Sequence, residues 1–292
     1  MNPYIILVIQ ILLSSGTHIV ANVVAKEVPA TNLTFLRTLI SGSVYLSYAL
    51  YAGLAFRFRG KDLLLLILLG LLSIPINQFL FLHGMRYTTA TDASLLYATT
   101  PVLVLIISRV YLKEKILPTK VGGSILAFLG VAMIVLENGL HIGMSHVKGD
   151  IFVFIGVIAW SLYTTLGRKL VLKHGAIQTT IFASLIGTCL FAPVGVYSSI
   201  GFNYSSLTTS EWMGIFYLAL GTSVAGYVLW YSALSKIEAG KVAVFTNGQP
   251  VMTAILAYIF LGQGITATFA LGAGVTIGGV VITQLNLRRR TP

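Results

Sequence analysis

The chain contains the same segment twice. Residues 87–134 align with residues 236–283 at a constant shift of 149 positions and without a gap. The residues shared at this shift are Ala90, Pro101, Val102, Ile106, Leu112, Ile116, Gly123, Gly130 and Val131, which recur as Ala239, Pro250, Val251, Ile255, Leu261, Ile265, Gly272, Gly279 and Val280. The connectors exchange their charge: Lys113, Glu114, Lys115 and Lys120 become Gly262, Gln263, Gly264 and Phe269, whereas Tyr87 and Asp92 become Lys236 and Lys241. Such an exchange is expected when two copies enter a membrane from opposite faces.

The composition requires a lipid environment. The chain is 56% hydrophobic and only 9% charged, with a mean hydropathy of +0.89, so no water-soluble domain could bury its apolar surface. The net charge of +11 would suggest nucleic acid as the partner of a soluble protein. Here the basic residues lie in short connectors between apolar runs, where they indicate membrane topology, and we expect no nucleic-acid binding.

Ten apolar runs reach the roughly 20 residues that a membrane helix needs. They cover residues 3–25, 33–54, 63–84, 91–112, 117–136, 150–171, 178–199, 212–234, 240–261 and 266–287. Five spans per half is an odd number, so the second half starts from the other face. We predict an all-α membrane protein with ten transmembrane helices in a 5+5 inverted-topology repeat around a central cavity. The expected units are a first repeat at 1–137, an outer linker at 138–149 and a second repeat at 150–292.

The Lys and Arg residues predict the orientation. With a cytoplasmic N-terminus, 15 of them lie in inner connectors and four outside, namely Lys26, Arg37, Arg86 and Lys148. We therefore expect a multi-pass protein of the cytoplasmic membrane with both termini inside. Residues 1–25 form a first span and not a cleavable signal, because they lack a basic head.

No acidic residue falls in the middle of a predicted span. The eight acids are Glu27, Asp62, Asp92, Glu114, Glu137, Asp150, Glu211 and Glu238. Without a clustered set of carboxylates the sequence predicts no metal site, no cofactor and no enzyme of the paired-carboxylate or lipid-modifying kind. The single Cys189 is expected to serve packing only.

Neutral polar and aromatic residues remain inside the spans, and they are the candidate cavity residues. They are His18, Asn22, Asn77, Gln78, Phe81, Tyr97, Trp160, Tyr163, Tyr227, Trp230 and Asn247. Asn77, Gln78 and Phe81 align with Gly226, Tyr227 and Trp230 at the repeat shift. Polar groups that face lipid are costly, so we expect these side chains to line the cavity. The alternative is that they hydrogen-bond neighbouring helices.

Matching prolines interrupt spans 4 and 9. Pro101 and Pro250 each remove a backbone hydrogen bond and free the carbonyls of Tyr97 and Thr246. Interruptions at equivalent places in two repeats favour a binding or hinge role. A kink that serves packing alone is the alternative.

Two charged or titratable groups and several glycines complete the candidates. His18 is the one titratable group that we place near mid-membrane, either as a structural group or as a proton carrier. Arg37 is expected to extend toward the outer surface, or else to attract anionic groups at an outer gate. Gly123, Gly130, Gly274 and Gly278 are expected at close helix contacts.

These features resemble the EamA branch of the drug/metabolite transporter superfamily. The residues that carry the resemblance are Tyr87-Thr88-Thr89-Ala90-Thr91-Asp92-Ala93-Ser94-Leu95-Leu96-Tyr97, Thr99-Thr100-Pro101-Val102 and Leu112-Lys113-Glu114-Lys115. The second copy has Ala239-Gly240, Pro250-Val251 and Leu261-Gly262-Gln263, where Gln263 replaces the usual Glu. The resemblance covers essentially the whole chain and is specific for the family, not for the cargo.

The resemblance implies a cavity between helices 1, 3, 4, 6, 8 and 9, alternating access, and export of amino acids or related small metabolites. The central spans lack the basic residues that phosphorylated cargo needs in this superfamily, and span 1 lacks the acid of small multidrug pumps. We therefore expect neutral or zwitterionic cargo. Export of other neutral or cationic metabolites or drugs is the alternative. Proton coupling through His18 and uncoupled facilitation both stay open, and the oligomeric state is not indicated.

Overall fold

The computed structural model describes residues 2–137, 144–252, 255 and 266–285. Every regular element in these ranges is helical, with no strand among them. Eight helical stretches of the described chain are long and apolar enough to cross a membrane. The second predicted span is the 22-residue helix Ala30–Tyr51, and the ninth is described continuously only as far as residue 252. The chain is an all-α membrane protein, as predicted.

Several spans are built from consecutive short elements. In chain order the elements are α1 (Pro3–Ser14), α2 (Thr17–Glu27), α3 (Ala30–Tyr51), α4 (Lys61–Leu71), the π-helix η1 (Leu72–Gln78), α5 (Phe79–Gly84), α6 (Ala90–Tyr97), α7 (Thr100–Tyr111), α8 (Pro118–Glu137), α9 (Met144–His174), α10 (Ala176–Ser199), the 3-10 turn η2 (Tyr204–Ser206), α11 (Thr209–Phe216), the π-helix η3 (Tyr217–Gly226), α12 (Tyr227–Leu234), α13 (Ala239–Ala243), the 3-10 turn η4 (Val244–Asn247) and α15 (Ala267–Gln284).

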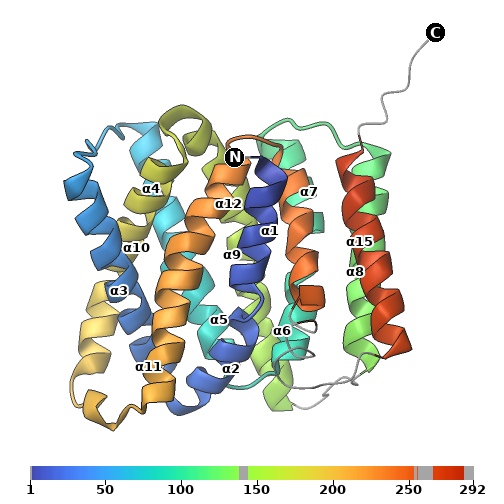
Figure 1. Ribbon diagram of the computed structural model, residues 1–292. Helices are drawn as coiled ribbons and strands as arrows, with labels where there is room; N and C mark the ends of the chain where they lie inside the picture. The colour runs from blue at the N-terminus through green and yellow to red at the C-terminus, as the bar shows by residue number, and fades with distance from the viewer. Residues whose placement is uncertain (1, 138–143, 253–254, 256–265, 286–292) are drawn as a thin grey trace.

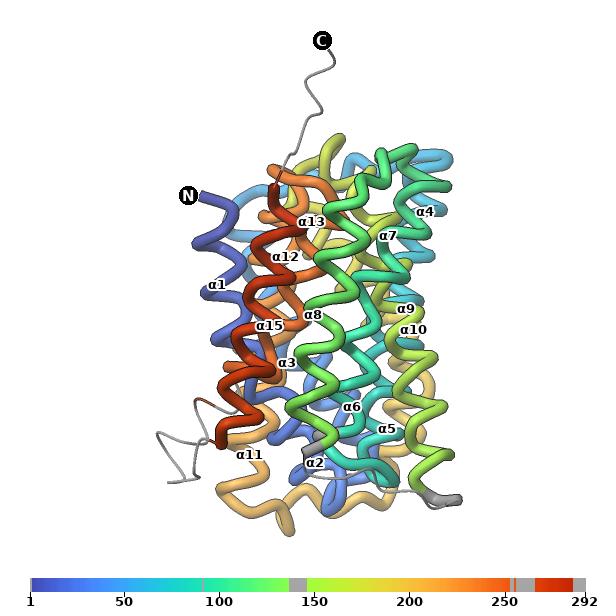
Figure 2. The backbone as a smooth tube through the Cα atoms, turned by 90° about the vertical axis from the view of Figure 1, so that its right-hand side faces the viewer, coloured from blue at the N-terminus to red at the C-terminus, as the bar shows by residue number. Residues whose placement is uncertain are grey.

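The helices stand nearly parallel in a single bundle (Figure 1). α8 and α15 form a pair at one edge, and α3, α4 and α10 lie at the opposite edge. Figure 2, turned by 90°, again shows α8 and α15 side by side. α1 begins and α15 ends at the same end of the bundle. A large buried apolar cluster joins α1 and α4 of the first half to α9, α12 and α13 of the second, so the two halves share one core.

Helix interruptions recur at equivalent places in the two halves. Residues 72–78 of η1 fall on residues 221–227 at the repeat shift, and η3 covers most of them. In the same way, α6 ends at Tyr97 before Pro101, and η4 ends at Asn247 before Pro250. A proline cannot donate the backbone hydrogen bond of a continuing helix, so the preceding turn ends or tightens there. The central spans of both repeats therefore carry irregular backbone at matched depth.

The first span differs from the sequence prediction because it is broken at Ser15 and Gly16, between α1 and α2. The break leaves the carbonyl of Leu13 without its usual helical partner, and the hydroxyl of Tyr217 on η3 donates to it at 2.7 Å. A β-carbon at position 16 would lie 2.7 Å from the same hydroxyl. Glycine at this position thus allows a residue of the second half to close the gap in the first span.

The sixth span begins earlier than predicted. α9 starts at Met144, inside the segment 138–149 that the sequence assigned to the linker; residues 138–143 lie outside the described part of the chain. The acidic Asp150 was expected to mark the start of the span, but it lies within the helix. Thr88 donates to its carboxylate at 2.5 Å, which gives this acidic side chain a hydrogen-bond partner within the protein.

Glycines bring α8 and α15 into close contact. A β-carbon at Gly123, Gly130, Gly272 or Gly279 would overlap the backbone of the facing helix, which confirms the predicted contacts of Gly123 and Gly130. The prediction for Gly274 and Gly278 is wrong, because no described atom lies within 4 Å of a β-carbon at either position. Residues 272 and 279 are seven apart and lie on the face toward α8, whereas 274 and 278 are rotated away from it.

Charged contacts connect the halves near the end of the bundle where α1 begins. Arg168 of α9 donates to Glu114 at 2.8 Å, and the same carboxylate accepts the backbone N–H of Ala239 at 3.1 Å. Lys120 forms an ion pair with Glu238 at 2.7 Å. The connectors α7–α8 and α12–α13 are thereby tied together by polar contacts across the repeat.

We expect Gly279→Val to lower the thermal stability of the purified protein, because the added side chain has to push apart two backbones. Overpacking of this kind costs about 1–3 kcal/mol. Gly278→Val is the matched control, since it introduces the same side chain one residue away in open space. The comparison is the midpoint of thermal aggregation in detergent, and equal midpoints for the two variants would contradict the packing.

Candidate functional site

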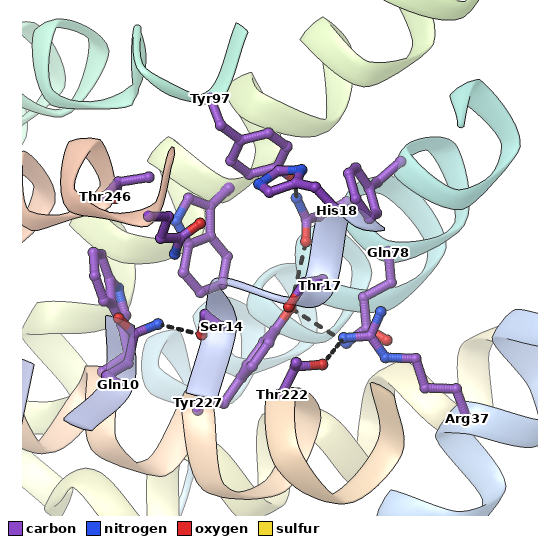
Figure 3. A pocket seen from close by; sticks show the side chains of 16 residues that line it. Gln10, Ser14, Thr17, His18, Arg37, Gln78, Tyr97, Thr222, Tyr227 and Thr246 are labelled. Carbon is purple, nitrogen blue, oxygen red and sulfur yellow. Dashed lines mark hydrogen bonds between the residues drawn. The ribbon is translucent and has the colours of Figure 1, made fainter. Parts of the chain in front are cut away.

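A cavity of about 80 Å³ lies between the two halves. Its lining is neutral and polar on several sides, aromatic on others, and contains one arginine (Figure 3). The lining residues are Gln10, Ser14, Thr17, His18, Arg37, Asn77, Gln78, Phe81, Tyr97, Trp160, Thr222, Gly226, Tyr227, Trp230, Thr246 and Gln249. None of them is Asp or Glu.

The interrupted helices supply most of the lining. The break between α1 and α2 places Ser14 and Thr17 on either side of it, and the π-helices contribute Asn77 from η1 and Thr222 from η3. A π-turn widens the helix and leaves backbone groups without standard partners, a geometry common at functional sites. In lipid, irregular backbone is stable where it faces protein or a polar cavity, which is its situation here.

A hydrogen-bond chain crosses the boundary between the repeats. Asn77 donates to the hydroxyl of Tyr97 at 2.9 Å and to the carbonyl of Gly156 at 2.8 Å. Gln78 donates to the hydroxyl of Tyr227 at 3.2 Å, and that hydroxyl donates to Asn77 at 3.3 Å. Gln78 and Tyr227 are exact repeat equivalents, 149 positions apart. The pair therefore meets near the pseudo-symmetry axis that relates the halves.

Aromatic rings form the other walls. Trp160 packs against Tyr163 with ring centroids 5.5 Å apart, against Tyr227 at 5.1 Å and against Trp230 at 5.4 Å. His18 meets Phe81 and Tyr97 edge-on at 5.5 and 5.3 Å. These faces present apolar area and π-electron density to whatever occupies the cavity.

Arg37 does not extend toward the outer surface as the sequence suggested. Its side chain is 3% exposed and points from α3 into the cavity. Its Nε donates to Ser223 at 2.7 Å and its Nη2 to Thr222 at 2.8 Å, both on η3. Because the guanidinium donates to these two hydroxyls, the side chain of Arg37 is stable when it points into the cavity. The expectation that no charge lies within the central cavity is therefore wrong.

Several cavity atoms have no hydrogen-bond partner among the described residues. They are Gln10 Oε1, Thr17 Oγ1, His18 Nδ1, Gln78 Oε1 and Thr246 Oγ1. A buried polar atom without a partner costs about 1–3 kcal/mol. Their convergence on one cavity gives it free hydrogen-bonding capacity for a polar ligand.

The structure brings eight of the eleven predicted cavity residues to the lining: His18, Asn77, Gln78, Phe81, Tyr97, Trp160, Tyr227 and Trp230. Asn22, Tyr163 and Asn247 do not line it. Asn22 donates to the carbonyls of Met85 and Thr88, each at 3.1 Å, and so joins α2 to the loop after α5. Tyr163 is fully buried behind Trp160, stacked on Tyr231 at 4.7 Å. Asn247 is fully buried next to the lining residue Thr246.

Sequence reasoning missed Gln10, Ser14, Thr17, Thr222, Gly226, Thr246 and Gln249 as cavity residues. A signal for the first of these was available. Gln10, Ser14 and His18 are spaced by four residues and share a helical face. Thr222 and Gly226 lie on a π-helix, whose register does not follow the ordinary helical spacing.

This fold and cavity agree with comparisons to known proteins. The sequence matches the EamA-like transporter family over residues 1–136 and again over residues 147–285. The chain belongs to the EamA-like transporter family. It is thus a membrane-embedded transporter of small molecules and not an enzyme, as predicted.

Two relatives are similar along most of their length. The chain is 28% identical to the uncharacterized transporter YetK of Bacillus subtilis, covering 99% of this chain and 88% of the relative. It is 30% identical to an uncharacterized transporter of Archaeoglobus fulgidus, covering 96% of each. A protein of known crystal structure shares the fold with a TM-score of 0.80 at 20% identity, covering 99% of both chains.

A more distant relative has a more specific name. The chain is 24% identical to a probable terminal-alkyne amino-acid exporter of Streptantibioticus cattleyicolor, over 80% of this chain and 76% of the relative.

We expect Asn77→Ala and Asn22→Ala to separate cavity function from structural support. Both remove two side-chain hydrogen bonds to neighbouring helices or loops and should lower stability by about 1–3 kcal/mol. Asn77→Ala should also weaken transport, since it releases Tyr97 and Tyr227 at the cavity. Asn22→Ala should leave transport per folded molecule close to wild type. Melting in detergent and transport in vesicles test the pair, and equal transport losses would contradict the assignment.

Proposed function

We propose that this transporter is a secondary exporter of small polar metabolites, with amino acids or related compounds as its cargo. The observation that carries the proposal is the cavity itself. It lies between the repeats, its polar atoms include several without partners, and its walls are aromatic. A cavity at the interface of inverted repeats, lined by interrupted helices, is typical of secondary transporters. The name of the Streptantibioticus relative adds support for amino acids.

The proposed mechanism is alternating access. At about 80 Å³ the cavity is far below the roughly 300–1,000 Å³ of typical small-molecule sites. Cargo entry therefore requires the halves to move apart. We place the hinges at Pro101 and Pro250, because each follows an interruption where a change of backbone angle breaks few hydrogen bonds.

The orientation also belongs to this proposal. The distribution of Lys and Arg supports an orientation with both termini in the cytoplasm, in a protein of the cytoplasmic membrane. The repeats of the proposed mechanism are residues 1–137 and 150–292. With this orientation, the polar contacts of Arg168, Glu114, Lys120 and Glu238 close the cytoplasmic end. The cavity can then open outward while these contacts hold.

Reconstituted vesicles preloaded with single amino acids should show counterflow of the labelled compound. We expect Gly226→Leu to reduce counterflow at least tenfold, because its β-carbon has room but its side chain fills the cavity between Ser14 and η3. Gly278→Leu is the control, since position 278 faces no described atom within 4 Å. Absence of counterflow for every amino acid, with a folded protein, would overturn the cargo assignment.

The same vesicles address the energy source. A proton gradient should drive uphill accumulation if transport is coupled, and His18→Gln should then abolish the pH dependence. Unchanged pH dependence in that variant would reject His18 as the proton carrier, and equilibration without accumulation would indicate facilitation.

For the hinges, we expect Pro101→Ala and Pro250→Ala to slow turnover severalfold without weakening cargo binding at equilibrium. Alanine can restore the missing backbone hydrogen bond and stiffen the span. Initial rates in vesicles and binding in detergent measure the two quantities separately. Variants with wild-type turnover would leave the prolines with a packing role only.

A further inference from the structure

Arg37 is a buried cation without an acidic partner in the described structure. The ion pairs of the described residues join Lys120 with Glu238, Arg168 with Glu114, and Lys173 and His174 with Asp62. None of them involves Arg37, and the cavity lining contains no carboxylate. A charge that is removed from water without a counter-charge is unfavourable and is rare inside membrane proteins unless it has a functional role.

The neighbours of Arg37 hold it in place without neutralising it. Nε and Nη2 donate to the hydroxyls of Ser223 and Thr222. The Thr222 hydroxyl donates its proton to the carbonyl of Leu218 at 2.6 Å. The hydroxyl oxygen is therefore free to accept the hydrogen bond from Arg37. Tyr45 donates to the carbonyl of Ser223 at 2.6 Å and fixes that part of η3. A guanidinium carries five N–H groups in a fixed fork, so donors remain after these two contacts.

The opposite side of the cavity offers acceptors. Gln10 donates to Ser14 at 2.8 Å, which leaves its Oε1 without a partner. Figure 3 shows Gln10 and Arg37 on opposite sides of the Tyr227 ring. Trp160 and Trp230 add aromatic faces, which attract an ammonium group. The cavity therefore has a positive group on one side of the Tyr227 ring and an acceptor, Gln10 Oε1, on the other.

We infer that Arg37 is the anchor for a carboxylate on the transported molecule, and that the cargo of this transporter must carry one. The inference rests on the proposed function and narrows it. A guanidinium matches the planar carboxylate with two parallel hydrogen bonds. The bound acid supplies the missing counter-charge, so cargo with a carboxylate binds better than the same compound as an amide or an amine. This selectivity opposes the alternative of cationic drugs as cargo.

Matched acid and amide pairs test the anchor directly. We would measure the rise in melting temperature of the purified protein with leucine against leucinamide and with 4-methylpentanoate against 4-methylpentanamide, at neutral pH. The acids should stabilise the wild-type protein and the amides should require at least tenfold higher concentration. Arg37→Gln should remove the difference. Arg37→Lys should recover part of it, because lysine keeps the charge but not the fork.

The outcomes separate the anchor from its rivals. A purely structural Arg37 would give a less stable Arg37→Gln protein with an unchanged preference for acids, or no preference in the wild type, and either result overturns the inference. Stabilisation by inorganic phosphate or sulfate equal to that by the acids would overturn the assignment to carboxylates. The binding test stands without transport, so a carboxylate preference that depends on Arg37 supports the anchor even if vesicles show no amino-acid counterflow, in which case only the proposed cargo fails.

Discussion

The structure depends on one constraint, that backbone polar groups inside a bilayer need partners within the protein. Most of the chain meets it with continuous helices. The interruptions at residues 15–16, 72–78, 98–99, 217–226 and 244–247 are exceptions, and they gather around the polar cavity between the two halves. Tyr217 supplies a partner for the carbonyl freed by the first break. Irregular backbone and polar side chains thus occur together, because both need polar neighbours when the surrounding solvent is lipid.

The duplication explains how this solution is built from one segment. The π-helices η1 and η3 occupy equivalent places, and the pair Gln78 and Tyr227 meets across the pseudo-symmetry axis. The outer edge of the bundle uses the same symmetry for a different purpose, since Gly123 and Gly130 face Gly279 and Gly272 at close backbone contact. Equivalent positions thus line the cavity near the axis and pack closely away from it.

Arg37 changes the physical description of the cavity. Considered from its acids alone, the chain has an uncharged centre suited to hydrogen bonding of neutral or zwitterionic molecules. With an arginine held by Thr222 and Ser223, the centre is positive on one side. A bound carboxylate would pair with Arg37, so that neither the charge of the cargo nor that of the protein would be isolated. Binding energy of that kind is available only when the cargo is present, which is useful in a transporter that must close around its cargo.

The sequence by itself determined the class of the protein, the spans with their approximate ends, the inverted repeat and the type of residue in the cavity, because hydropathy, charge and duplication are properties read along the chain. Only the tertiary structure decided how each helix is rotated about its axis. That rotation selects Gln10 and Ser14 over Asn22, turns Arg37 inward, and brings Gly272 and Gly279 to the contact with α8 while Gly274 and Gly278 face away. The physical reason is that a polar side chain can avoid lipid either by lining the cavity or by hydrogen-bonding a neighbouring helix. In addition, π-turns shift the helical register, so the packing between distant segments decides which side chains reach the cavity.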